Sequence, residues 1–94
     1  MGKHLSALDY LTDQMPYLYS YRGHAVYDVS KCIDQYGNYF LNFYSLEFPE
    51  NKNILNSIQF LRLNYPDAYG DEEYSIKEIA KMMDEYVSYL IEML

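Results

Sequence analysis

The chain has 94 residues, of which 14 are acidic and 7 are basic, and its formal net charge is −7. This length predicts one domain spanning residues 1–94, and a hydrophobic content of 50% argues against wholesale disorder. The negative charge disfavours direct binding to nucleic acid and to anionic membranes, because both require cations on the protein.

Three further features bear on the cellular location and the source of the protein. The sequence contains no run of 18 apolar residues, so we expect no membrane span. Cys32 is the single cysteine and cannot form an internal disulfide, which favours a reducing, cytoplasmic location. Abundant Asn, Tyr and Ile with few Ala residues hint at an AT-rich genome, such as that of a low-GC bacterium or its phage.

The N-terminal third predicts a helix followed by a strand. Leu5, Leu8, Leu11 and Met15 recur every three or four residues, which is typical of one face of a short helix that Pro16 ends. The segment 17–21 then carries Tyr at alternate positions, and aromatic residues at period two favour a short strand.

Residues 25–36 allow two interpretations. As a helix, they place their apolar residues on one face, with Gly37 just past the end. As a strand, they are rich in Val, Tyr and Ile, and residues 34–37 begin with Asp and end with Gly, which is typical of a type I turn. We choose the strand, and we expect residues 39–48 to form the returning strand.

The C-terminal half predicts two helices. Residues 50–65 repeat apolar positions at helical spacing, with Asn51 or Asn53 as the N-cap. Ser75 and Glu78 form a capping box, so the last helix should run from there to the C-terminus. We identify no internal repeat. The predicted fold is α+β: a helix, a three-stranded antiparallel meander and two C-terminal helices, with an all-α helical bundle as the alternative.

The last helix has more apolar surface than one buried face requires. Beside its core stripe runs a second stripe, which we call the Met/Tyr stripe: Met82, Tyr86, Tyr89 and Met93. One interpretation is a central helix covered on both sides by its own domain. The other is a contact with a partner or with a second copy of the chain, because interfaces favour Tyr and Met.

The negative charge lies mainly in the C-terminal half. Residues 47–94 hold ten acidic and four basic residues, against four and three in residues 1–46. The charge is densest in the acidic loop, whose carboxylates alternate with tyrosines: Tyr65, Asp67, Tyr69, Asp71, Glu72, Glu73 and Tyr74. This loop is either a solvated segment or a patch that docks on a basic surface.

No pattern in the sequence predicts catalysis. His4 and His24 lie far apart without neighbouring metal ligands, so we expect neither a metal site nor a cofactor. A buried structural role suits Cys32, and the carboxylate pairs lie on surfaces where their pKa stays ordinary. We find no family resemblance that rests on particular residues.

The sequence therefore predicts a small, acidic, Tyr-rich and non-enzymatic binding protein. Its charge suits the occlusion of a basic, nucleic-acid-binding site on a protein partner, as by an inhibitor, an immunity protein or a phage anti-defence protein. The alternative is a homo-oligomeric accessory or regulatory subunit that associates through its C-terminal helix.

Overall fold

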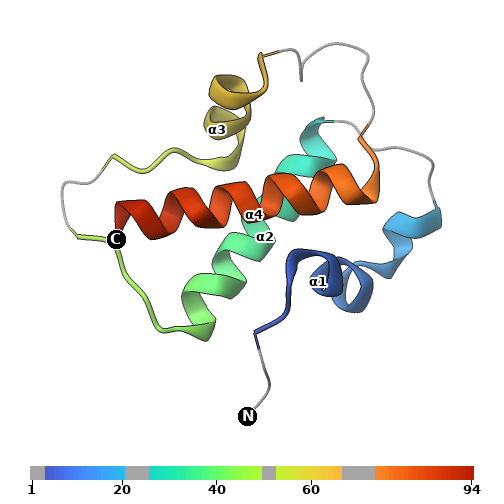
Figure 1. Ribbon diagram of the computed structural model, residues 1–94, viewed down its shortest axis with the longest axis horizontal. Coiled ribbons are helices and arrows are strands. Elements are labelled where there is room, and N and C mark those ends of the chain that lie inside the picture. The colour runs from blue at the N-terminus through green and yellow to red at the C-terminus, as the bar shows by residue number, and fades with distance from the viewer. Residues whose placement is uncertain (1–3, 21–25, 50–52, 67–73) are drawn as a thin grey trace.

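The computed structural model describes residues 4–20, 26–49, 53–66 and 74–94. These residues form helices and no strand: α1 (Ala7–Gln14), the 3₁₀ helix η1 (Pro16–Ser20), α2 (Val26–Phe43), α3 (Ser57–Asn64) and α4 (Ile76–Met93) (Figure 1). The α+β prediction is therefore wrong, and the all-α alternative agrees with the structure.

Helix α2 replaces the second predicted strand and the first five residues of the third. Its apolar residues recur at helical spacing and are buried: Val26, Val29, Cys32, Ile33, Tyr36 and Phe40. The helix wins over the strand because it buries all of these side chains on one face, whereas the pleat would divide them between two faces. The predicted first strand, residues 17–21, falls largely in η1, and its last residue lies outside the described segments.

Gly37 lies inside α2 and does not close a turn. A Cβ atom at this position would lie 3.2 Å from Cε2 of Tyr86, on α4. The glycine therefore provides the close approach of two helices, and the type I turn prediction was wrong. Helix α2 instead ends near Ser45, which has a positive φ of 52°.

The other helix ends follow ordinary capping chemistry. Ser75 and Glu78 form the predicted capping box at the start of α4, which confirms that boundary. A second capping box joins Asn56 and Gln59, so α3 begins later than predicted and neither Asn51 nor Asn53 is its N-cap. At α1 the side chain of Ser6 accepts a hydrogen bond from the N–H of Asp9.

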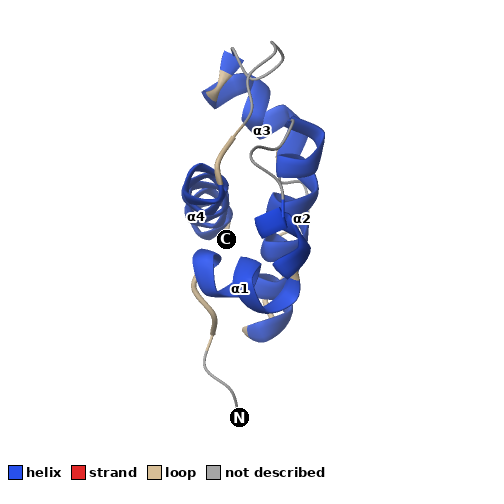
Figure 2. Cartoon of the chain, turned by 90° about the vertical axis from the view of Figure 1, so that its right-hand side faces the viewer, coloured by secondary structure: helices blue, strands red, loops and turns tan. Residues whose placement is uncertain are grey.

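The helices form a thin slab of 38 × 34 × 14 Å. Helices α2 and α4 cross at its centre, with α3 at one edge and α1 at the opposite edge (Figures 1 and 2). Helix α1 packs mainly on α4, and α3 packs mainly on α2. Each short helix thus lies against the long helix of the other half of the chain.

The helix bounds reveal an internal repeat, so the expectation of no internal repeat was wrong. Adding 50 to the residue numbers of α1 and α2 gives the bounds of α3 and α4. We call residues 4–44 the first half and residues 54–94 the second half. Few described residues are identical in the two halves, which is why the repeat is inconspicuous in the sequence: Leu5/Leu55, Leu11/Leu61, Pro16/Pro66, Lys31/Lys81, Asp34/Asp84, Tyr36/Tyr86 and Tyr39/Tyr89.

Candidate functional site

An open groove of about 690 Å³ runs along α4. We call it the α4 groove. Leu8 of α1 lines one side, and Phe60 and Asn64 of α3 line the other. The residues of α4 that line it are Lys77, Ala80, Lys81, Asp84, Glu85, Ser88, Tyr89 and Glu92. Because the groove is open, it suits a macromolecular surface better than an enclosed small molecule.

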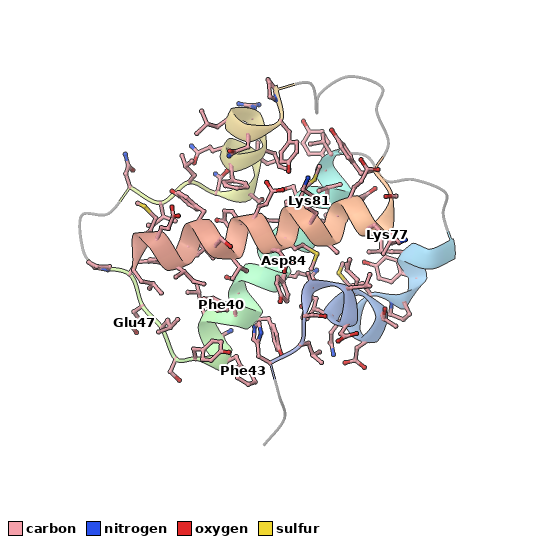
Figure 3. The ribbon with its side chains drawn as sticks, viewed as in Figure 1. Phe40, Phe43, Glu47, Lys77, Lys81 and Asp84 are labelled. Atoms are coloured by element: carbon pink, nitrogen blue, oxygen red, sulfur yellow. The ribbon has the colours of Figure 1, made fainter. Side chains whose placement is uncertain are left out.

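The helical repeat explains why these α4 side chains share one face. Residues 77, 81, 84 and 88 follow one another at spacings of four and three, so their side chains emerge on the side away from α2. Figure 3 shows Lys77, Lys81 and Asp84 in succession along the helix. The buried face of the same helix holds Ile79, Met83 and Leu90.

Charge is unevenly distributed along this groove. The two cations, Lys77 and Lys81, lie toward the N-terminus of α4, while the carboxylates of Asp84 and Glu92 lie toward its C-terminus. Partial desolvation raises the pKa of Asp84. None of these groups forms an ion pair with another described residue.

The predicted acidic patch can be followed only at its two ends. Asp67, Tyr69, Asp71, Glu72 and Glu73 lie outside the described residues. Tyr74 is buried, with 6% of its surface exposed. Tyr65 is half-buried and its hydroxyl donates a 2.6 Å hydrogen bond to Oε1 of Glu85. Burial and this hydrogen bond raise the pKa of Tyr65. The two described tyrosines therefore contact the chain's own residues.

The Met/Tyr stripe is largely covered by the chain itself. Met82 and Tyr86 are buried, and Tyr89 and Met93 are partly buried. The Tyr86 hydroxyl donates to the carbonyl of Leu55 at 2.7 Å, and the N–H of Leu55 donates to the Tyr89 hydroxyl at 2.8 Å. These contacts match the interpretation of α4 as a central helix, flanked by its own domain.

The sequence did not predict an aromatic cluster that surrounds His4. Its imidazole stacks on Tyr39 at 4.9 Å and meets Phe40 and Phe43 edge-on. Figure 3 places Phe40 and Phe43 together near the end of α2. The residues concerned lie 35 or more positions apart from His4, and an isolated histidine gives no periodic signal of such a contact.

The remaining chemically reactive groups are few among the described residues. Cys32 is buried, as predicted, and burial, followed by the charge of Asp28, raises its thiol pKa to about 11. A thiol with such a pKa stays protonated at neutral pH and is a poor nucleophile. In the described segments, no three His, Cys, Asp or Glu residues gather closely enough to hold a metal ion.

Comparison with known proteins adds no relative: no family model, curated protein or solved structure matches the chain. None of the described helices is long and apolar enough to cross a membrane.

Proposed function

We propose that the protein is a non-enzymatic binding protein that docks on a basic surface of a protein partner. The observation that carries this proposal is a set of nine acidic side chains, which outnumber the four Lys and Arg residues of the described segments. All are exposed except Glu85, which is half-buried. The set comprises Asp9, Asp13, Asp28, Asp34, Glu47, Glu78, Asp84, Glu85 and Glu92.

An excess of negative charge acts before contact is made. A net charge of −7 on 94 residues attracts a cationic surface over about one Debye length, roughly 8–10 Å in physiological salt. Such attraction raises the association rate and rejects acidic partners. The α4 groove then offers apolar contact through Leu8 and Phe60, beside carboxylates of α4.

Basic surfaces on proteins are commonly the places where nucleic acid binds. An acidic protein seated there excludes the phosphate backbone by occupying its cations. We therefore infer that occlusion of a nucleic-acid-binding site is the mode of action, as in an inhibitor, an immunity protein or a phage anti-defence protein. A single, buried and reduced Cys32 suits action in the cytoplasm.

The test is affinity capture from the native host at about 50 mM and 500 mM salt, with a double-stranded oligonucleotide as competitor. We expect one retained basic protein, which is released by high salt and displaced by the oligonucleotide. A partner that remains bound in the presence of saturating oligonucleotide would contradict the occlusion of a nucleic-acid site.

A matched pair of variants locates the contact on the protein. Asp84→Asn with Glu92→Gln removes two charges from the α4 groove, and Asp9→Asn with Asp13→Asn removes two from α1. We expect the first pair to slow association with the captured protein several-fold at low salt, and the second pair to slow it less. Equal effects of the two pairs would show that only net charge matters, and would remove the groove from the proposal.

A further inference from the structure

The repeat extends from the helix bounds to the hydrogen bonds that hold each half together. In the first half, the N–H of Leu5 donates to the hydroxyl of Tyr39 and its carbonyl accepts from Tyr36, each at 2.8 Å. In the second half, Leu55 makes the same two bonds with Tyr89 and Tyr86, at 2.8 and 2.7 Å. In each half, two tyrosines one helical turn apart thus form hydrogen bonds with the backbone of one leucine.

A triangle of aromatic rings accompanies each of these leucines. Tyr10 lies 5.3 Å from Tyr36 and 5.0 Å from Tyr39, measured between ring centroids. Phe60, the equivalent of Tyr10, lies 5.2 Å from Tyr86 and 5.5 Å from Tyr89. Equivalent side chains therefore adopt equivalent positions although the two halves have diverged in sequence.

The contacts between the halves repeat as well. Helix α1 packs on α4 as α3 packs on α2, and α2 and α4 pack on each other. The electrostatic relations are reciprocal too: after burial, the charge of Asp34 raises the pKa of Tyr86, and the charge of Asp84 raises that of Tyr36. In each half, one aspartate raises the pKa of a buried tyrosine of the other half.

The main packing contacts stay the same when α2 is exchanged with α4 and α1 with α3, as a two-fold rotation would require. In Figure 2 the two long helices lie in separate layers, and the two short helices lie at opposite ends of the slab. An interface in which both sides use the same surface is isologous, which is the arrangement of a two-fold dimer. Here both sides belong to one chain, joined through residues 45–53.

We propose that the chain is a covalently joined dimer, whose first half can pair with a second half supplied by another copy of the chain. The surface concerned is the packing surface between the halves, and the partner is the opposite half. The wild-type chain pairs within itself because the connection gives its own second half a high effective concentration. The inference rests on the repeat and needs no other protein, so it stands apart from the proposed function.

Two full-length variants test the exchange. One carries Leu11→Asp and Ile33→Asp in the first half, and the other carries Leu61→Asp and Met83→Asp in the second half. All four positions have exposed fractions of 0–1%. Each variant alone should be unfolded, because each buries two unpaired charges.

Mixed in equal amounts, the two variants contain one intact first half and one intact second half. We expect the far-ultraviolet circular dichroism to recover about half of the wild-type helical signal, and light scattering to give the mass of two chains. The control mixture combines two variants damaged in the same half, the Leu11/Ile33 variant and Val29→Asp, and should stay unfolded. Recovery in the control as well, or no recovery in the test mixture, would overturn the proposal.

A circular permutant provides a second test that needs no mixing. Residues 44–54 connect Phe43 to Leu55. The rotation requires the same reach from Met93 to Leu5, to which Leu94 and residues 1–4 contribute. About six added Gly and Ser residues between Leu94 and Met1 complete that reach. The permutant that starts at residue 49 should keep the wild-type helical signal and unfold cooperatively. A permutant that is unfolded would show that the order of the halves matters, which a joined dimer does not allow.

Discussion

The two halves of the chain share a backbone plan and differ in the side chains that fill it. In both halves, two tyrosines at equivalent positions form hydrogen bonds with the backbone of a leucine, Leu5 or Leu55. Other positions diverge: the exposed Asn42 of α2 corresponds to the exposed Glu92 of α4, and the exposed Gln35 corresponds to the half-buried Glu85. The hydrogen-bonded tyrosines are thus preserved, while the net charge is larger on the second half, which has eight acidic and three basic residues against four and two in the first half.

Exposed positions do not all diverge, and the exceptions are informative. Lys31 and Asp34 on α2 recur as Lys81 and Asp84 on α4, although all four are exposed. No ion pair with another described residue explains them. The two aspartates lie near the helix crossing, where their charges raise the pKa of Tyr86 and Tyr36. Nothing in the structure explains the repeated lysine.

The largest expected effect concerns the leucines at the centre of each short helix. Leu11 and Leu61 are equivalent and have no exposed surface. Truncation of either to Ala should cost about 2–5 kcal/mol in the free energy of unfolding, and the two costs should agree to within about 1 kcal/mol. Urea unfolding measures both. The controls are Leu8→Ala and Leu63→Ala, which alter side chains exposed by 44% and 72%. A large cost on one half alone would break the equivalence.

The second comparison concerns the helix crossing, where Gly37 corresponds to Val87. Gly37→Val forces branched methyl groups toward the Tyr86 ring, and overpacking of this kind costs about 1–3 kcal/mol. Val87→Gly removes a buried side chain and introduces a helical glycine, at a similar cost. If the two positions are related by the rotation, the double variant simply exchanges their residues. It should then lose less stability than the sum of the losses of the two single variants. Melting temperatures that fall additively would show that the positions are independent.

The third comparison concerns the contacts of α3 with α2 and of α1 with α4. Ser30 and Ser57 are buried and joined by a 2.8 Å hydrogen bond between their hydroxyls. The equivalent positions are Ala80 and Ala7, both buried and apolar. Either Ser→Ala change alone leaves one buried hydroxyl unpaired, at about 1–2 kcal/mol, whereas the double change reproduces the alanine pair and should be nearly neutral. A double-mutant cycle on the free energy of unfolding measures this coupling. An additive cycle would mean that the hydroxyls do not depend on each other.

Some of this structure could be predicted from the sequence, and the reasons are physical. Capping chemistry is local, so Ser75 and Glu78 located the start of α4 correctly. Helix α2 was missed because Val, Tyr and Ile suit strands, and only packing against α4 decides in favour of a helix. Gly37 was interpreted as a turn residue because the contact that requires a glycine there is with Tyr86, which is 49 residues away in the sequence.

The candidate site was less predictable than the fold. The α4 groove requires Leu8 and Phe60 to flank α4, and their positions depend on the tertiary arrangement of all the helices. The width of the apolar arc on α4 was visible in the sequence. Its cause was visible only in the structure, where Leu55 and Phe60 cover Tyr86 and Tyr89.

The smallest expected effect concerns alkaline pH and the tyrosines of the crossing helices. Burial, and then the charge of Asp84, raises the pKa of Tyr36 to about 12. Burial, and then the charge of Asp34, raises the pKa of Tyr86 to about 12. An unfolded tyrosine has a pKa of about 10, so between pH 10 and 12 the unfolded chain releases protons that the folded chain keeps. The stabilisation by these two protonated hydroxyls is therefore fully present below pH 10 and is lost as the pH rises to 12.

Replacement of Tyr36 and Tyr86 by Phe removes both titrating groups. Each change should cost about 1 kcal/mol at neutral pH, because a backbone carbonyl of Leu5 or Leu55 loses its donor. The double variant should then lose less stability than the wild type between pH 10 and 12. Urea midpoints across this range measure the slope, and the control Tyr27→Phe, at a side chain 66% exposed, should leave it unchanged. The buried thiol of Cys32 titrates in every variant, so its contribution cancels from the comparison. A double variant with the same slope as the wild type would mean that these tyrosines ionise as readily in the folded chain as in the unfolded one.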